Sequence, residues 1–154
     1  MARGTYSGPQ DCNCLAVRQA ARHITQFYDQ LLAPSGLRTT QFSVLAKLRR
    51  LGPMTINALA AEMVMDRTTL GRNILPLERD GLVIVEQGSR DRRSKELRVT
   101  EAGEARFRAG MKGWVKAQRQ FEAAFGAKRA TDMRVLLHAV AATKLGTHAA
   151  SAEQ

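Results

Sequence analysis

Two neighbouring segments near the middle of the 154-residue chain carry apolar residues at helical spacing. Over residues 55–63 the apolar positions recur every three or four residues, and the hydroxyl of Thr55 is suited to cap the helix that this pattern predicts. After a short break, Asp66 is suited to cap a second helix over residues 67–80. In that helix Leu70, Ile74 and Leu77 would face inward. The pattern is typical of a helix-turn-helix.

A short hairpin is predicted after the second helix. Gly81 stands where a left-handed residue ends a helix, and residues 82–85 form a short β-branched run. Residues 96–100 alternate, with Leu97 and Val99 on one face and Arg98 on the other. The loop between the strands, residues 88–95, holds four cationic side chains and one carboxylate. An arginine-bearing hairpin tip is shaped to enter a DNA minor groove or to lie along phosphates.

Four sequence pieces, in order and at matching spacing, resemble the MarR-type winged-helix transcription regulators. They are Asp-Arg-Thr-Thr-Leu at 66–70, Leu-Glu-Arg-Asp-Gly-Leu-Val at 77–83, Asp-Arg-Arg at 91–93 and Leu-Arg-Val-Thr-Glu-Ala-Gly at 97–103. The resemblance extends from about residue 14 to residue 145. It implies a mainly α fold with a small β-hairpin wing, a winged helix-turn-helix that dimerises through its N- and C-terminal helices.

Long helices are predicted on both sides of this motif. A helix over residues 11–32 has the apolar stripe Leu15, Ala16, Ala20, Ile24, Phe27, Tyr28 and Leu31, and Pro34 to Gly36 end it. A second helix runs over residues 39–51, with Thr39 or Thr40 as its cap. Helices over 101–125 and 131–145 follow the hairpin. In the first of them an apolar seam consists of Phe107, Met111, Trp114, Gln118, Phe121 and Phe125.

The predicted domain organisation is one intertwined domain with three parts. Residues 1–10 form a flexible N-terminus, residues 37–100 form the winged helix-turn-helix, and residues 11–36 and 101–148 form a helical dimerisation region. Exposed seams of this size would invite aggregation, which favours a homodimer. The alternative is that the terminal helices fold back onto their own core.

The charge of the chain favours a polyanionic partner. The formal net charge is +10, the isoelectric point is near 10.6, and the hydrophobic content of 44% is ordinary for a globular protein. Because the cations fall on the predicted hairpin and second helix, double-stranded DNA is the expected partner. A merely basic protein is the alternative that charge alone leaves open.

Several other classes of protein are disfavoured. No apolar run reaches the length of roughly 20 residues that crosses a bilayer, and residues 1–9 lack the core of a signal peptide. The expected location is therefore cytoplasmic, where Cys12 and Cys14 would be thiols. The two cysteines and His23, His138 and His148 lack the paired spacing of a zinc site, so no metal or other cofactor is expected. No nucleophile–base pair or phosphate-cradling glycine loop is present, so an enzyme is not expected.

The side chains predicted to contact DNA lie on the second helix and the hairpin loop. They are Arg67, Thr68, Thr69, Arg72 and Asn73 on the helix, and Arg90, Asp91, Arg92 and Arg93 in the loop. Arg72 is suited to guanine and Asn73 to adenine, with a phosphate contact as the alternative for Arg72. The family resemblance implies that Arg93 enters the minor groove while Asp91 holds its guanidinium, with Arg90 and Arg92 near phosphates.

Two hypotheses cover the regulatory input. The resemblance implies an effector pocket between the dimer helices and the winged domain, for which the candidates are Arg22, His23, Gln26, Tyr28, Gln41, Phe42 and Trp114. Arg22 or His23 would meet a carboxylate and Phe42 or Trp114 would stack on a ring, which suits an aromatic acid or its thioester. The alternative interpretation of Phe42 and Trp114 is a place in the core.

The second input is oxidation of Cys14, which lies fourteen residues before Tyr28, as in the related hydroperoxide sensors. The second tyrosine of that pattern falls at Thr39. The alternative function is that of an architectural DNA-binding protein with no effector. It predicts weak sequence preference.

Overall fold

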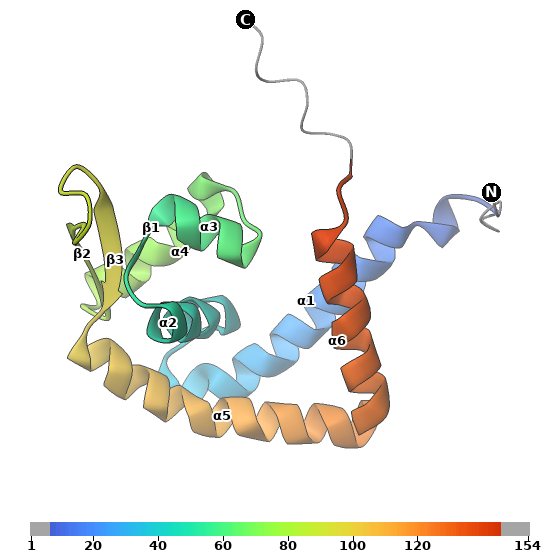
Figure 1. The fold of residues 1–154 in the computed structure, drawn as a ribbon. Helices are drawn as coiled ribbons and strands as arrows, with labels where there is room; N and C mark the ends of the chain where they lie inside the picture. Colours follow the sequence, from blue (N-terminus) through green and yellow to red (C-terminus); the bar gives the residue numbers. More distant parts are fainter. Residues whose placement is uncertain (1–6, 146–154) are drawn as a thin grey trace, which may run out of the picture. The chain divides into compact units, whose positions relative to one another are not determined.

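The computed structural model describes residues 7–145. The expected flexible N-terminus up to residue 6, the end of the 101–148 region and His148 lie outside the described residues. The chain forms two compact units, Met1–Ala117 and Gln118–Gln154, each of which is described by itself. Helices dominate the fold, and a small sheet accompanies them (Figure 1).

The order of the elements matches a winged helix-turn-helix. The helices are α1 Asn13–Leu32, α2 Thr39–Leu51, α3 Ile56–Met63, α4 Arg67–Arg79, α5 Glu101–Phe125 and α6 Ala127–Ala142. The strands are β1 Met54–Thr55, β2 Val83–Gln87 and β3 Lys95–Val99, and 3-10 turns cover Pro9–Asp11 and Ala33–Ser35. The last helix begins at Ala127, four residues before the predicted start at residue 131. The mainly α fold with a hairpin wing is thus confirmed.

The sheet has one strand more than the predicted hairpin. Its order is β1-β3-β2, and both pairings are antiparallel. Val83 pairs with Val99 in the hairpin, while Met54 pairs with Leu97 on the other side of β3. Two residues are too short to show an alternating pattern, so β1 was not predictable from periodicity. It ties the segment before α3 to the base of the wing.

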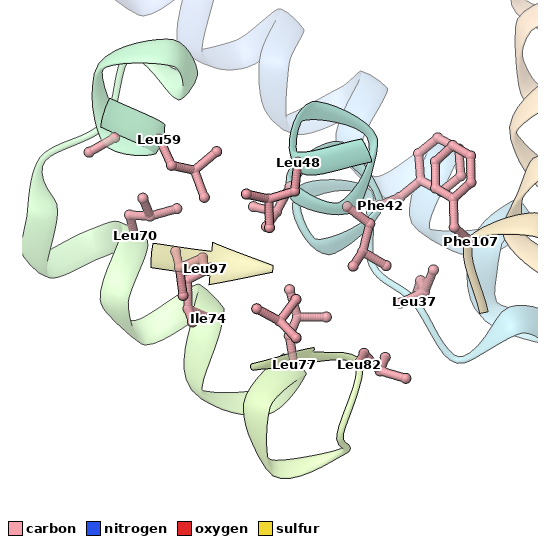
Figure 2. Packing of buried hydrophobic residues seen from close by; sticks show 14 of the residues in the cluster. Leu37, Phe42, Leu48, Leu59, Leu70, Ile74, Leu77, Leu82, Leu97 and Phe107 are labelled. Carbon is pink, nitrogen blue, oxygen red and sulfur yellow. The ribbon is translucent and has the colours of Figure 1, made fainter. Parts of the chain in front are cut away.

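The hydrophobic core lies where α2, α3, α4 and β3 meet (Figure 2). Leu70, Ile74 and Leu77 are at most 2% exposed, which confirms the predicted inward face of α4. Figure 2 shows them directed toward Leu48 of α2 and Leu97 of β3. Burial of a leucine or isoleucine side chain contributes about 1.5–3 kcal/mol, so this face fixes which side of α4 meets solvent.

The start of α2 differs from the prediction. Neither Thr39 nor Thr40 caps the helix. Arg38 is the capping residue, and its backbone N–H donates to Oε1 of Gln41 at 2.9 Å. The backbone N–H and the hydroxyl of Thr39 both donate to Oδ1 of Asp29, each at 2.7 Å. Thr39 therefore joins α2 to α1, because the carboxylate of Asp29 competes successfully for its hydroxyl.

The first half of the predicted α5 seam packs onto its own chain. The ring of Phe107 stacks on Phe42 of α2 with centroids 4.7 Å apart, and Trp114 lies 6.3 Å from Phe42. Met111 also packs against this core. For these three residues the structure shows the fold-back alternative.

Within the described residues, no helix has the length and apolar character needed to cross a membrane.

The joint between α3 and α4 contains a strained residue. Val64 has φ 52° and is 71% exposed, and among the described residues it alone combines a positive φ with a side chain. This conformation is costly for a β-branched residue because Cβ crowds the backbone. Val64 ends α3 in the left-handed turn, and its N–H donates to Ala61 O at 3.1 Å.

Replacing Val64 by Gly should raise the free energy of unfolding by about 0.5–1 kcal/mol, because the strain is removed and little apolar contact is lost. Chemical denaturation of the full chain measures the change. Gly81→Ala is the matched control: it places a Cβ at φ 69°, in open space, and should destabilise by about 1 kcal/mol. A Val64→Gly protein less stable than wild type would contradict the strain argument.

Candidate nucleic-acid interface

The first turn of α4 is held by its capping residue. Oδ1 of Asp66 accepts the backbone N–H of Thr69 at 2.8 Å, and Oδ2 accepts the Thr69 hydroxyl at 2.6 Å. The Thr69 hydroxyl and then its N–H lower the pKa of the Asp66 carboxyl, because both stabilise the ionised form. The predicted cap is confirmed. Thr69, predicted to contact DNA, also serves this cap.

The outer face of α4 presents polar side chains to solvent. Arg67, Thr68 and Arg72 are exposed, and Asn73 is half-buried. Nδ2 of Asn73 donates to Thr69 O at 2.9 Å, so its amide lies along the helix. Within the described part of the chain, no ion pair or hydrogen bond engages the side chains of the two arginines. The face therefore offers two guanidinium groups and a hydroxyl, which are suited to phosphates and base edges.

The wing loop is a closed turn with outward arginines. Gly88 N–H donates to Ser94 O at 2.9 Å, and the Ser94 hydroxyl donates to Asp91 O at 2.7 Å. Oδ1 of Asp91 accepts the backbone N–H of Arg93 at 2.9 Å. Arg90, Arg92 and Arg93 are exposed.

This arrangement differs from the expected Asp91–Arg93 contact in one respect. Among the described residues, no ion pair joins the Asp91 carboxylate to the Arg93 guanidinium. Asp91 shapes the backbone of the turn through a side-chain-to-backbone bond two residues on. The guanidinium of Arg93 is left to project from the loop.

The base of the wing is fastened by residues that periodicity did not reveal. The Thr100 hydroxyl donates to Gly81 O at 2.6 Å and accepts the N–H of Gly103 at 3.0 Å. Gly103 is buried, and a Cβ there would collide with the backbone of Leu82. On the outer side of the hairpin, Arg98 pairs with Glu86 at 2.9 Å. Leu-Arg-Val-Thr-Glu-Ala-Gly at 97–103 was a sequence signal for this junction, although it did not identify the contacts.

A cavity of about 380 Å³ lies between α2 and α5. Its lining residues are Phe42, Ser43, Ala46, Lys47, Arg50, Phe107, Met111 and Trp114. Two of the predicted effector residues, Phe42 and Trp114, are thus brought together. The cationic residues at this cavity are Lys47 and Arg50, which sequence analysis missed because apolar periodicity says nothing about which polar residues border a cavity.

The other predicted effector residues lie elsewhere. Arg22, His23 and Gln26 are exposed on α1 and do not line this cavity. Tyr28 packs edge-on against Phe27, with ring centroids 5.7 Å apart. The side chain of Gln41 accepts the backbone N–H of Arg38 at the start of α2. The anion-binding role expected of Arg22 or His23 therefore finds no support at this cavity, because α1 contributes none of its lining residues.

Both cysteines lie exposed at the start of α1 as free thiols. Sγ of Cys12 accepts the backbone N–H of Leu15 at 3.4 Å, so Cys12 caps the helix, and Cys14 is its second residue. Thr39, at the place of the second tyrosine of the hydroperoxide sensors, is engaged with Asp29. Among the residues that the structure describes, no cluster of histidine, cysteine and acidic side chains could hold a metal ion.

A polar outer face on α4, a buried inner face and an arginine-tipped hairpin define a winged helix-turn-helix DNA-binding protein. The chain belongs to the MarR family of transcriptional regulators. The MarR family model matches residues 37–95. The crystal structure of the transcriptional regulator MosR of M. tuberculosis in complex with DNA is 38% identical in sequence, with a TM-score of 0.74. That match covers 88% of this chain and 100% of the other.

Other relatives agree with this assignment. YwoH of Bacillus subtilis, an uncharacterised regulator of the helix-turn-helix type, is 35% identical over 91 residues, which are 59% of this chain and 66% of YwoH. The match to a Bacillus anthracis relative spans about half of that protein, 52%. CouR of Rhodococcus jostii, solved with p-coumaroyl-CoA bound, is 21% identical with a TM-score of 0.74, over 91% of this chain and 99% of CouR. At that identity the likeness concerns the fold alone.

The Asp66 cap should make thermal stability depend on pH in acid. Since its folded pKa lies below the unfolded value of about 3.9, its contribution is present above about pH 4 and is lost as the pH falls through the folded pKa. The melting temperature of wild type should therefore exceed that of Asp66→Asn near neutrality, and the difference should shrink toward ~pH 2. Asp11, whose pKa is also lowered, is present in both proteins and cancels. A difference that stays constant with pH would contradict the assignment.

Proposed function

We propose that this MarR-family regulator binds an inverted-repeat operator in double-stranded DNA as a homodimer, represses transcription there, and is released by a small-molecule effector. The observation that carries the proposal is the two-sided character of α4. On its inner face Leu70, Ile74 and Leu77 are at most 2% exposed. On its outer face Arg67 and Arg72 project into solvent.

Base recognition is assigned to the outer face of α4. Arg72, with its free guanidinium fork, can donate two hydrogen bonds to O6 and N7 of guanine. Arg67 and Thr68, in the first turn, are suited to phosphate or base contacts near the helix N-terminus. Asn73 would have to leave Thr69 O before it could meet adenine. In the wing, the exposed Arg93 is assigned to the minor groove, and Arg90 and Arg92 to phosphates.

Exposed apolar side chains support the homodimer. In the first unit, Leu15 and Val17 of α1 are exposed. In the second unit, α6 exposes Val135, Leu136, Leu137 and Val140. Covering these faces by a second copy would remove apolar surface from water. Two-fold pairing would also supply two α4 helices for major-groove sites about 34 Å apart.

The proposed effector is an aromatic acid or its thioester, held in the cavity between α2 and α5. The cavity combines aromatic rings with the cations Lys47 and Arg50. The binding of p-coumaroyl-CoA, an aromatic thioester, by CouR supports this class of compound. Oxidation of the exposed Cys14 is the second candidate input, and a release assay with an organic hydroperoxide in place of the acid separates the two.

Substitution at Arg72 tests sequence-specific recognition. On a duplex selected by the wild-type protein from a random pool, Arg72→Ala should weaken binding by roughly 5- to 150-fold and relax the preference at one base pair in each half-site. Arg92→Ala, which removes a proposed phosphate contact, should instead weaken binding to all duplexes and lower the salt slope by about 1. Gel shifts at several salt concentrations measure both.

Arg79→Ala is the matched control, since Arg79 lies at the far end of α4 and pairs with Asp80 at 3.0 Å. It should bind as wild type does. If wild type selects no duplex above background, the sequence-specific regulator is excluded and an architectural DNA-binding protein takes its place.

The homodimer has its own test. Sedimentation equilibrium should give twice the chain mass of 17.0 kDa for wild type, and Leu136→Glu should shift the protein toward monomer because a carboxylate would be buried at the interface. Ile84→Glu, an exposed apolar position on the wing, is the control and should remain dimeric. A wild-type protein that sediments as a monomer would contradict the proposal.

A further inference from the structure

The α2–α5 cavity has a chemical polarity that favours an amphiphilic anion. Its wall is made of stacked aromatic rings, and Figure 2 shows Phe42 and Phe107 face to face. The ring of Trp114 also stacks on Phe42, with centroids 6.3 Å apart. Two cations and one hydroxyl, from Lys47, Arg50 and Ser43, complete the lining, and no carboxylate is part of it. A flat apolar body with one negative group matches this arrangement.

One of these cations already has a partner on another helix. Nζ of Lys47 lies 3.1 Å from Oε2 of Glu62 in α3, and the two side chains are 30% and 46% exposed. Such a half-exposed pair is weak enough to be exchanged. A second carboxylate beside Lys47 would be repelled by Glu62, so a bound anion and Glu62 compete for the same ammonium group.

Arg49, which lies close to Lys47 on α2, is not available in the same way. Nε of Arg49 lies 2.6 Å from Oε2 of Glu104, and its guanidinium lies 4.2 Å above the ring of Phe107. Both of these contacts join α2 to α5, on which the cavity is also built. Lys47 differs because its partner belongs to α3. An exchange at Lys47 would therefore remove a contact between α2 and α3, the first helix of the helix-turn-helix.

Glu62 stands next to the strained joint that precedes α4. It lies two residues before Val64, whose φ is 52°. The joint is closed by the N–H of Met65, which donates to Ala60 O at 2.9 Å, and Asp66 then caps α4. Strain of this kind persists only while the surroundings hold it in place. The Lys47–Glu62 pair is one of the contacts that hold the end of α3 against α2.

We infer that Lys47 is the residue that selects an anionic ligand in this cavity, and that the ligand carboxylate displaces Glu62 from Lys47, which loosens the end of α3 and the joint before α4. The inference rests on the proposed function, because it names how the proposed effector site acts on the DNA-binding helix. It requires no covalent step. The acidic ligand exchanges one ion pair for another.

The test uses the full chain and the fluorescence of Trp114, which is the single tryptophan of the sequence and lines the cavity. The probes are 3-phenylpropanoate and its neutral isostere 3-phenylpropanamide. Wild type should bind the acid roughly tenfold more tightly than the amide, as expected for a hydrogen bond to a charged group. Lys47→Met should reduce this preference to about twofold or less, with amide binding unchanged.

Glu62→Gln separates exchange from simple attraction. Because it removes the competing carboxylate, it should strengthen acid binding by roughly two- to fivefold and leave amide binding unchanged. Glu86→Gln is the matched control, since Glu86 is about as exposed as Glu62 and pairs with Arg98 on the wing, and it should change neither affinity. Hydrogen exchange over residues 56–63 should rise when wild type binds the acid, and should already be raised in unliganded Glu62→Gln.

Each failure has a distinct meaning. Unchanged acid affinity in Glu62→Gln, or an acid preference that survives Lys47→Met, overturns the exchange while the cavity remains a ligand site. If neither the acid nor the amide binds to wild type, the inference and the proposed aromatic-acid effector are overturned together. Neither result touches operator binding by α4, whose failure would appear only in the gel shifts.

Discussion

The burial of one face of α4 is the constraint on which the rest of the structure depends. Leu70, Ile74 and Leu77 are removed from water against α2, α3 and β3. A helix has one angular position for a given buried stripe, so this packing also fixes which side chains project outward. Rotation of α4 that buried Arg72 would cost both the apolar contacts and the desolvation of a guanidinium.

The wing and its neighbouring helix are built on the same core. Leu97 of β3 is buried among the leucines of the helices, and β1 pairs with it on the other side. Thr100 and Gly103 then connect the base of the hairpin to α5, through a hydroxyl bond to Gly81 O and a close backbone approach at Leu82. An exposed arginine loop is thereby presented from a base that is packed on the core, as is common for functional loops on a scaffold.

The proposed effector cavity between α2 and α5 adjoins this core. Phe42 belongs to the buried cluster and also lines the cavity, so a ligand there would touch residues that support the helix-turn-helix. A ligand shifts an equilibrium only through a difference in its contacts between two states. The proposed exchange of Glu62 for a ligand carboxylate at Lys47 would be such a difference, beside the strained turn at Val64.

The sequence alone determined the features that depend on local periodicity and capping. It predicted α2 and α5 to the residue, the Asp66 cap, the buried face of α4 and the hairpin. Tertiary structure decided the rest, because partners distant in the chain compete for the same groups. The carboxylate of Asp29 accepts the Thr39 hydroxyl, and the first half of the α5 seam packs on Phe42. Lys47 borders the cavity, whereas Arg22 and His23 do not. Such contacts join residues with no fixed sequence spacing, so no pattern along the chain encodes them.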